Sequence, residues 1–154
     1  MAVILNRKLG RVGLGMLGLD VHTKGIRTLA SRLDEYGADV AFLGEHLTVE
    51  YLVAQAKQRD VDLIGISFSS GAYVDHCRDV VKEMRSQGVD VPLMIGGLVH
   101  KDDHPALNEL GIEGIFGPGS DIEDIVAFIE KVTRERVTRR DACETDGHQE
   151  KIDG

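Results

Sequence analysis

The sequence predicts an α/β domain built on a doubly wound sheet of five parallel strands, with helices on both faces in three layers. Short apolar segments alternate along the chain with longer segments whose apolar residues recur at i, i+3, i+4 and i+7, the pattern of strands followed by helices. The third apolar segment, VDLIGIS, is almost wholly apolar, as expected for a strand covered on both faces. Gly37, Gly88 and Gly111 each follow a helical segment, where a left-handed residue ends a helix.

The predicted strands recur along most of the chain. They span residues 11–16, 40–43, 61–67, 91–95 and 114–116. The apolar stripes of the helices between them lie within residues 26–33, 49–56, 73–84 and 122–129. Ser120 with Glu123 has the spacing of a capping box before the last of these helices. Five βα units without a sixth strand favour the flavodoxin-like strand order 2-1-3-4-5 over the Rossmann order.

The length of 154 residues fits one domain. We expect an N-terminal extension over residues 1–9, the folded domain over 10–134 and a tail over 135–154. The tail has mixed charges and few apolar residues, which predicts a segment that is disordered or bound to a partner.

Composition excludes several classes of function. The formal net charge of −8 disfavours nucleic acid, whose phosphates would be repelled. No apolar stretch is long enough to cross a bilayer, and the apolar run at the N-terminus is too short for a signal peptide. The two cysteines make no disulfide framework, so a reducing cytoplasm is the simpler setting.

Ligands of open α/β sheets bind at the carboxyl ends of the strands, beside the switch point between strands 1 and 3. The loop after the first strand, GMLGLDVHTKG, carries Asp20 and His22. A neutral imidazole is a good ligand for a transition metal, and a carboxylate on its other nitrogen fixes the tautomer. Gly25 would permit close packing against a flat ligand. Spacing alone slightly favours a polar loop in which Asp20 caps the next helix.

Two further loops lie at the same predicted edge. The loop after strand 3, SFSSG, offers small hydroxyl side chains at Ser67 and Ser69, although for this loop taken alone N-capping of the next helix is the favoured explanation. Gly96 and Gly97 follow strand 4, where absent side chains would let a ligand approach the backbone or would form an ordinary turn.

Taken together, these loops match a known pattern. Asp20-x-His22-x-x-Gly25, a serine after strand 3 and a Gly-Gly after strand 4 resemble the cobalamin-binding domain of the adenosylcobalamin-dependent mutases. The likeness extends through the GPGS segment at 117–120 and covers roughly residues 10–132. The short motif is weak alone, whereas the ordered set on the loops of one fold is specific.

The resemblance implies that His22 is the lower axial ligand of cobalt and that Asp20 orients it. The benzimidazole would be displaced from cobalt, and the nucleotide tail would run past Ser67. The expected cofactor-binding residues, with His22 as the metal ligand and none of them catalytic, are Asp20, His22, Gly25, Ser67, Ser69, Gly96, Gly97, Gly117 and Gly119. Ser69 stands where the family usually has leucine, so Ser69 or Phe68 is expected to reshape the slot for the displaced base.

A radical mutase also needs a TIM barrel that holds the substrate, and no barrel fits in 154 residues. The resemblance therefore implies the cobalamin-binding small subunit of a two-component acyl-CoA mutase, an isomerase that is inactive without its large subunit. The GISFSSGA and IFGPGS stretches favour the acyl-CoA type over the glutamate mutase small subunit. The sequence fixes neither the acyl-CoA substrate nor the oligomeric state, and association with a second copy stays open.

Other readings remain open or fit less well. A corrinoid carrier for methyl transfer shares the motif but resembles a helical bundle fused ahead of the domain, and few residues precede the first strand here. Non-enzymatic cobalamin delivery or sensing also stays open. A phospho-receiver domain would want an aspartate where Ser67 ends strand 3, and a flavodoxin would want a hydroxyl-rich loop after strand 1.

Three further features have simple explanations. His46, after Gly44 at the end of the second strand, is a weak candidate for contact with the cofactor rim or a partner. His100 and His104 have metal-ligand spacing, but a solvated loop before Pro105 is the more natural reading. Cys77 lies on the apolar face of its helix and is expected in the core.

Overall fold

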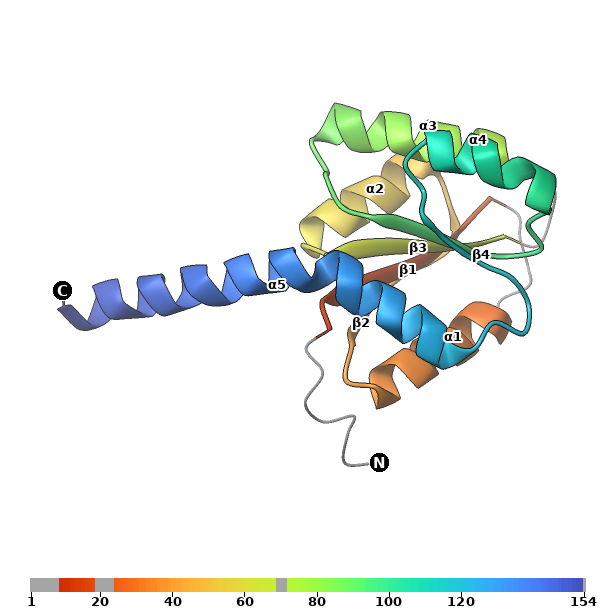
Figure 1. Cartoon of the computed structure of the whole chain (residues 1–154). Helices are drawn as coiled ribbons and strands as arrows, with labels where there is room; N and C mark the ends of the chain where they lie inside the picture. Colours follow the sequence, from red (N-terminus) through yellow and green to blue (C-terminus); the bar gives the residue numbers. More distant parts are fainter. Residues whose placement is uncertain (1–8, 19–23, 69–71, 154) are drawn as a thin grey trace.

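The computed structural model describes residues 9–18, 24–68 and 72–153, and for 140–153 it describes the backbone only (Figure 1). The strands are β1 Arg11–Leu17, β2 Asp39–Leu47, β3 Leu63–Phe68, β4 Leu93–Gly97 and β5 Gly114–Phe116. The helices are α1 Lys24–Glu35, α2 Val49–Gln58, α3 Tyr73–Gln87, the short 3₁₀ helix Lys101–Asp103, α4 His104–Glu109 and α5 Ile122–Asp153. The predicted strands are all present.

The five strands form one parallel sheet in the order β2-β1-β3-β4-β5. This is the predicted flavodoxin-like order. Because β2 and β3 lie on opposite sides of β1, the connections that leave β1 and β3 run in opposite directions, and their separation creates a crevice at the carboxyl edge.

Helices cover both faces of the sheet, so the molecule has three layers (Figure 1). Helices α1 and α5 lie on one face, and α2, α3 and α4 lie on the other. Side chains alternate along β3: Leu63 packs in the core beneath α1 and α5, whereas Ile64, Ile66 and Phe68 pack in the core beneath α2 and α3. Each face of the sheet therefore has its own apolar core.

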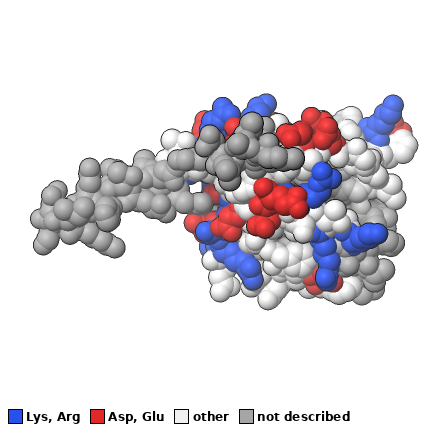
Figure 2. Space-filling view, turned by 90° about the horizontal axis from the view of Figure 1, so that it is seen from below, with Lys and Arg blue, Asp and Glu red and all other residues white. Residues whose placement is uncertain are grey.

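Charged side chains of the two signs are interspersed on the face seen from below (Figure 2). On the described part of this face, Lys and Arg form no broad continuous basic surface. Such a surface is the electrostatic footprint of nucleic-acid binding, so this face agrees with the acidic net charge. Within the described ranges, every helix is too short or too polar to span a bilayer.

Helix α5 continues to Asp153 and projects beyond the sheet, so it includes the segment predicted to be disordered or bound to a partner (Figure 1). The predicted boundary at residue 134 therefore falls inside a helix. Arg136 donates from Nη1 to the Asp90 carbonyl at 3.0 Å, and its Nε lies 3.4 Å from Asp62 Oδ1. Polar contacts of this kind leave no apolar period in a sequence, while the Arg, Glu and Lys of the segment are good helix formers.

A buried carboxylate fixes the start of β1 at the amino edge of the sheet. The Asp62 side chain is fully buried, and its Oδ2 accepts a hydrogen bond from the Arg11 N–H at 2.8 Å. Nearby, Thr133 Oγ1 accepts from the Gly10 N–H at 3.3 Å and donates to the Ile129 carbonyl at 2.6 Å. The amino edge is thus held by groups from β1, α5 and the residue before β3.

We expect Asp62→Ala to lower the free energy of unfolding by about 1–3 kcal/mol, because the Arg11 N–H loses its buried acceptor. Asp39→Ala is the matched control: Asp39 accepts from Arg11 Nε at 2.8 Å, but its side chain is 65% exposed. That exposed pair should contribute less than about 1 kcal/mol. Urea unfolding of the three proteins measures both effects, and equal losses would contradict the assignment.

Candidate functional site

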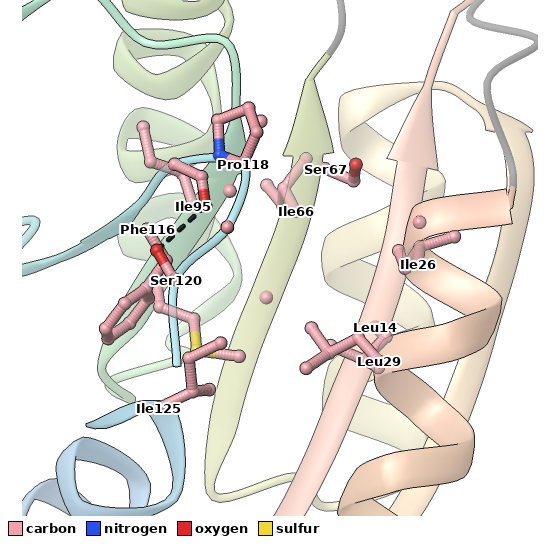
Figure 3. Close-up of a pocket in the computed structure, with 17 residues that line it drawn as sticks. Leu14, Ile26, Leu29, Ile66, Ser67, Ile95, Phe116, Pro118, Ser120 and Ile125 are labelled. Atoms are coloured by element: carbon pink, nitrogen blue, oxygen red, sulfur yellow. Dashed lines mark hydrogen bonds between the residues drawn. The ribbon is translucent and has the colours of Figure 1, made fainter. Parts of the chain in front are cut away.

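A cavity of about 330 Å³ opens at the carboxyl edge of the sheet, between the strands and helices α1 and α5 (Figure 3). It is lined by Leu14, Gly25, Ile26, Leu29, Gly65, Ile66, Ser67, Met94, Ile95, Gly96, Gly97, Phe116, Gly117, Pro118, Gly119, Ser120 and Ile125. These residues come from β1, β3, β4, β5, α1, α5 and the connection before α5, so the pocket lies at the switch point that the topology predicts.

The pocket exists because side chains become small toward the carboxyl ends of two neighbouring strands. On the α1 and α5 face, Leu63 of β3 is followed by Gly65 and Ser67, and Met94 of β4 is followed by Gly96. A Cβ atom on Gly65 would lie 2.7 Å from Leu14 Cδ2 and 3.0 Å from Met94 Cε. Larger residues at these positions would close the space into ordinary core.

The chemistry of the pocket is that of an apolar slot. No charged side chain is among the described residues that line it, and Leu14, Leu29, Phe116 and Ile125 provide much of its wall (Figure 3). Its side-chain hydroxyls are those of Ser67 and Ser120. A group that enters must therefore be uncharged, largely apolar and compact, since an ion would lose its hydration without a counter-charge.

Of the nine predicted cofactor-binding residues, six line this pocket: Gly25, Ser67, Gly96, Gly97, Gly117 and Gly119. They come from four segments that are distant in sequence, namely the start of α1, the ends of β3 and β4 and the connection before α5, and the fold brings them to one cavity. Asp20, His22 and Ser69 lie outside the described residues. Their predicted roles as ligand, orienting group and slot residue therefore remain predictions.

The two glycines with clear geometry have different reasons to be glycine. Gly97 has a φ of +117°, and a Cβ there would lie 1.7 Å from the Phe68 carbonyl oxygen. Its lack of a side chain is required by the close approach of β3 and β4, whatever else the pocket holds. Among the described residues, no atom lies within 4 Å of a Cβ position on Gly25, so this residue leaves open space at the described wall of the pocket.

Phe68, one of the two residues expected to reshape the slot for the displaced base, does not line this pocket. Its ring packs on the opposite face of the sheet, 6.3 Å from the Tyr73 ring and stacked at 6.0 Å on His76. Because successive residues of a strand point to opposite faces, Ser67 faces the pocket and Phe68 does not.

The turn before α5 is also held differently from the predicted capping box. Ser120 Oγ donates to the Gly117 carbonyl at 2.8 Å and so closes the GPGS turn on itself (Figure 3). The Glu123 N–H instead donates to Asp121 Oδ1 at 3.2 Å. Asp121, the residue directly before α5, therefore caps this helix, and Ser120 remains in the wall of the pocket.

Gly65 and the apolar wall were missed from the sequence. Gly65 has a detectable signal, since a small residue at two-residue spacing from Ser67 places both on one face of a buried strand. Leu29, Met94, Phe116 and Ile125 carry no such signal, because their periodicity is that of ordinary core residues.

The other candidate groups have structural roles. Tyr73 donates its hydroxyl hydrogen to Asp103 and accepts from the His100 N–H at 3.0 Å, and the bond to Asp103 raises the pKa of Tyr73 above its usual value. His100 Nδ1 accepts from the Asp102 N–H at 3.2 Å.

In the part of the chain that the structure describes, no group of three or more His, Cys, Asp or Glu could hold a metal. Burial raises the pKa of the Cys77 thiol to about 12, so it is a neutral core group.

Residues 10–127 match the profile of the B12 binding domain, and the chain belongs to this family of cobalamin-binding domains. Three relatives of this chain are mutases or mutase subunits. The chain is 31% identical to the 2-hydroxyisobutanoyl-CoA mutase small subunit of Aquincola tertiaricarbonis over 84% of this chain and 96% of that subunit. It is 33% identical to the pivalyl-CoA mutase small subunit of Xanthobacter autotrophicus over 82% of this chain and 88% of that one.

A third relative is much longer. The chain is 32% identical to the ethylmalonyl-CoA mutase of Methylorubrum extorquens over 92% of this chain but 21% of that enzyme. It therefore spans about a fifth of the length of this relative.

Two solved structures show the same fold. A cobalamin-binding protein from Desulfitobacterium hafniense superposes with a TM-score of 0.66 at 20% identity, over 79% of this chain and 57% of that one. A response-regulator receiver domain from Francisella superposes with a TM-score of 0.63 at 15% identity, over 82% of this chain and 98% of that one. The fold alone is therefore shared by proteins of different function, and the site must separate them.

Proposed function

We propose that this chain is the cobalamin-binding small subunit of a two-component, adenosylcobalamin-dependent acyl-CoA mutase, inactive alone and completed by a separate TIM-barrel subunit. The observation that carries the proposal is the uncharged pocket at the switch point, lined by six residues of the cobalamin pattern. The small subunits of two acyl-CoA mutases, which resemble this chain over most of their own length, support the assignment to this class.

The described pocket residues fit the benzimidazole at the end of a corrinoid's nucleotide tail. A benzimidazole is flat, uncharged and apolar on its faces, which suits a wall of Leu14, Leu29 and Ile125. The hydroxyl of Ser67 lies at the mouth end of β3, where a polar atom of the tail would need a partner. The cavity of about 330 Å³ is within the range of small-ligand sites.

The loop that joins β1 to α1 would supply the remaining contacts. His22 would ligate cobalt from below, and Asp20 would hold the imidazole in the tautomer that leaves the ligating nitrogen free. Cobalamin, when bound, supplies the cobalt–carbon bond whose homolysis starts the radical rearrangement, while the protein supplies binding and orientation. The large subunit would hold the acyl-CoA substrate.

The central prediction concerns the absorption spectrum of added cobalamin. With the wild-type chain we expect a base-off spectrum with histidine on cobalt, and with His22→Ala we expect loss of the histidine-ligated form and more than about tenfold weaker binding. His104→Ala, which changes a histidine outside the pocket, is the control and should behave as wild type. A His22→Ala spectrum identical to that of wild type would contradict the ligand assignment.

A second prediction concerns the pocket. Gly25→Leu should fill the open space at its wall and weaken cobalamin binding at least about tenfold, since a side chain then competes with the tail for one cavity. Thr28→Leu, an exposed position on the same helix, should bind normally. Calorimetric titration measures both.

Cobinamide, which lacks the nucleotide tail, is the diagnostic ligand for the pocket. It should bind the wild-type chain and Gly25→Leu equally weakly, because it places nothing in the cavity. Equal wild-type affinity for cobinamide and cobalamin would show that the tail does not occupy this pocket.

A third prediction concerns the division of labour. The chain with adenosylcobalamin should rearrange no acyl-CoA, and addition of the large subunit of an acyl-CoA mutase should give turnover that requires both proteins. Chromatographic assay of the isomeric thioesters measures this outcome. Turnover by the chain alone would refute a separate catalytic subunit.

A further inference from the structure

The carboxyl end of β2 is irregular in a way that the sheet itself does not require. Its register with β1 shifts between Leu14 and Gly15 and again between Gly15 and Leu17. Within this bulged end, His46 has a φ of +56°, which is uncommon for a residue with a side chain. A glycine would adopt this conformation without strain, so the turn alone does not account for a histidine here.

The imidazole of His46 contacts Gly18, the first residue after β1. Its Nδ1 lies 3.0 Å from the Gly18 carbonyl oxygen, and because that oxygen can only accept, Nδ1 carries the hydrogen and donates it. The Gly18 N–H donates to the Leu47 carbonyl at 3.0 Å. Two successive residues of β2 therefore bind the two backbone polar groups of Gly18.

The preceding residue of β2, Glu45, contacts the first turn of the helix that follows the β1–α1 connection. Arg27, in the first turn of α1, donates to Glu45 Oε1 from Nε at 3.1 Å and from Nη2 at 2.5 Å. The Glu45 side chain is 22% exposed and that of Arg27 is 66% exposed, so solvent screens the pair in part. Adjacent residues of β2 thus hold the chain on the two sides of residues 19–23.

We propose that Glu45 and His46 are positioning residues, which fix both ends of the β1–α1 connection and thereby set where it presents its cofactor ligand. This inference rests on the proposed function, in which that connection carries His22. A ligating side chain must be held within a fraction of an ångström of its productive position, and groups that support a ligand from outside commonly have large effects on metal affinity. The bulge places two such supports side by side on the strand that flanks β1.

His46 variants separate positioning from a purely structural role. His46→Gly removes the imidazole and relieves the left-handed backbone, so the fold should be as stable as wild type or more stable. Its cobalamin affinity should fall about three- to tenfold, the range expected for one lost hydrogen bond, with a smaller histidine-ligated fraction in the spectrum. His46→Asn tolerates this φ and offers an amide N–H to the Gly18 carbonyl, so it should restore both readouts.

The positioning role of Glu45 is tested by comparing variants of two carboxylates, each of which pairs with an arginine. Glu45→Gln should weaken cobalamin binding, whereas Asp75→Asn, which alters the exposed Arg78–Asp75 pair far along the chain, should leave it unchanged. Equal cobalamin binding by wild type and His46→Gly would overturn the positioning role, as would a loss that Asn fails to restore. A wild-type chain that shows no histidine-ligated spectrum would instead overturn the proposed function, and this inference with it.

Discussion

The pocket depends on a packing constraint within a sheet that is covered on both faces. Helices α1 and α5 rest on large side chains such as Leu63 and Met94 through most of the sheet, but at the carboxyl ends the same face carries Gly65, Ser67 and Gly96. The helices are held at a fixed distance by the core behind, so they cannot collapse onto these small residues. The space that remains is the cavity.

Stability and ligand chemistry are concentrated at opposite edges of this sheet. At the amino edge, the buried carboxylate of Asp62 accepts from β1 and pairs with Arg136 of α5. At the carboxyl edge, the same helix begins beside the pocket and contributes Ile125 to its wall. Helix α5 thus joins the polar anchor at one edge of the sheet to the apolar pocket at the other.

Much of this arrangement could be predicted from the sequence because it follows from periodicity and topology. Alternation and strand count predicted the sheet order, and the order predicted the edge at which Gly25, Ser67 and Gly96 meet. The continuation of α5 could not be predicted in this way, since Arg136 is held by polar contacts that leave no apolar period. Ser and Asp are both favourable N-cap residues, so residue type alone could not show that Asp121 caps α5 in place of the predicted Ser120.

The separate reasons for Gly97 and Gly25 have a consequence for how such chains diverge. The carbonyl of Phe68 excludes any side chain at position 97, so a descendant that had lost its ligand would still retain glycine there. Position 25 faces open space and would be free to drift once nothing occupied the slot. Retention of glycine at position 97 therefore reports inheritance of the backbone. Under the proposed function, retention of glycine at position 25 would report continued use of the pocket.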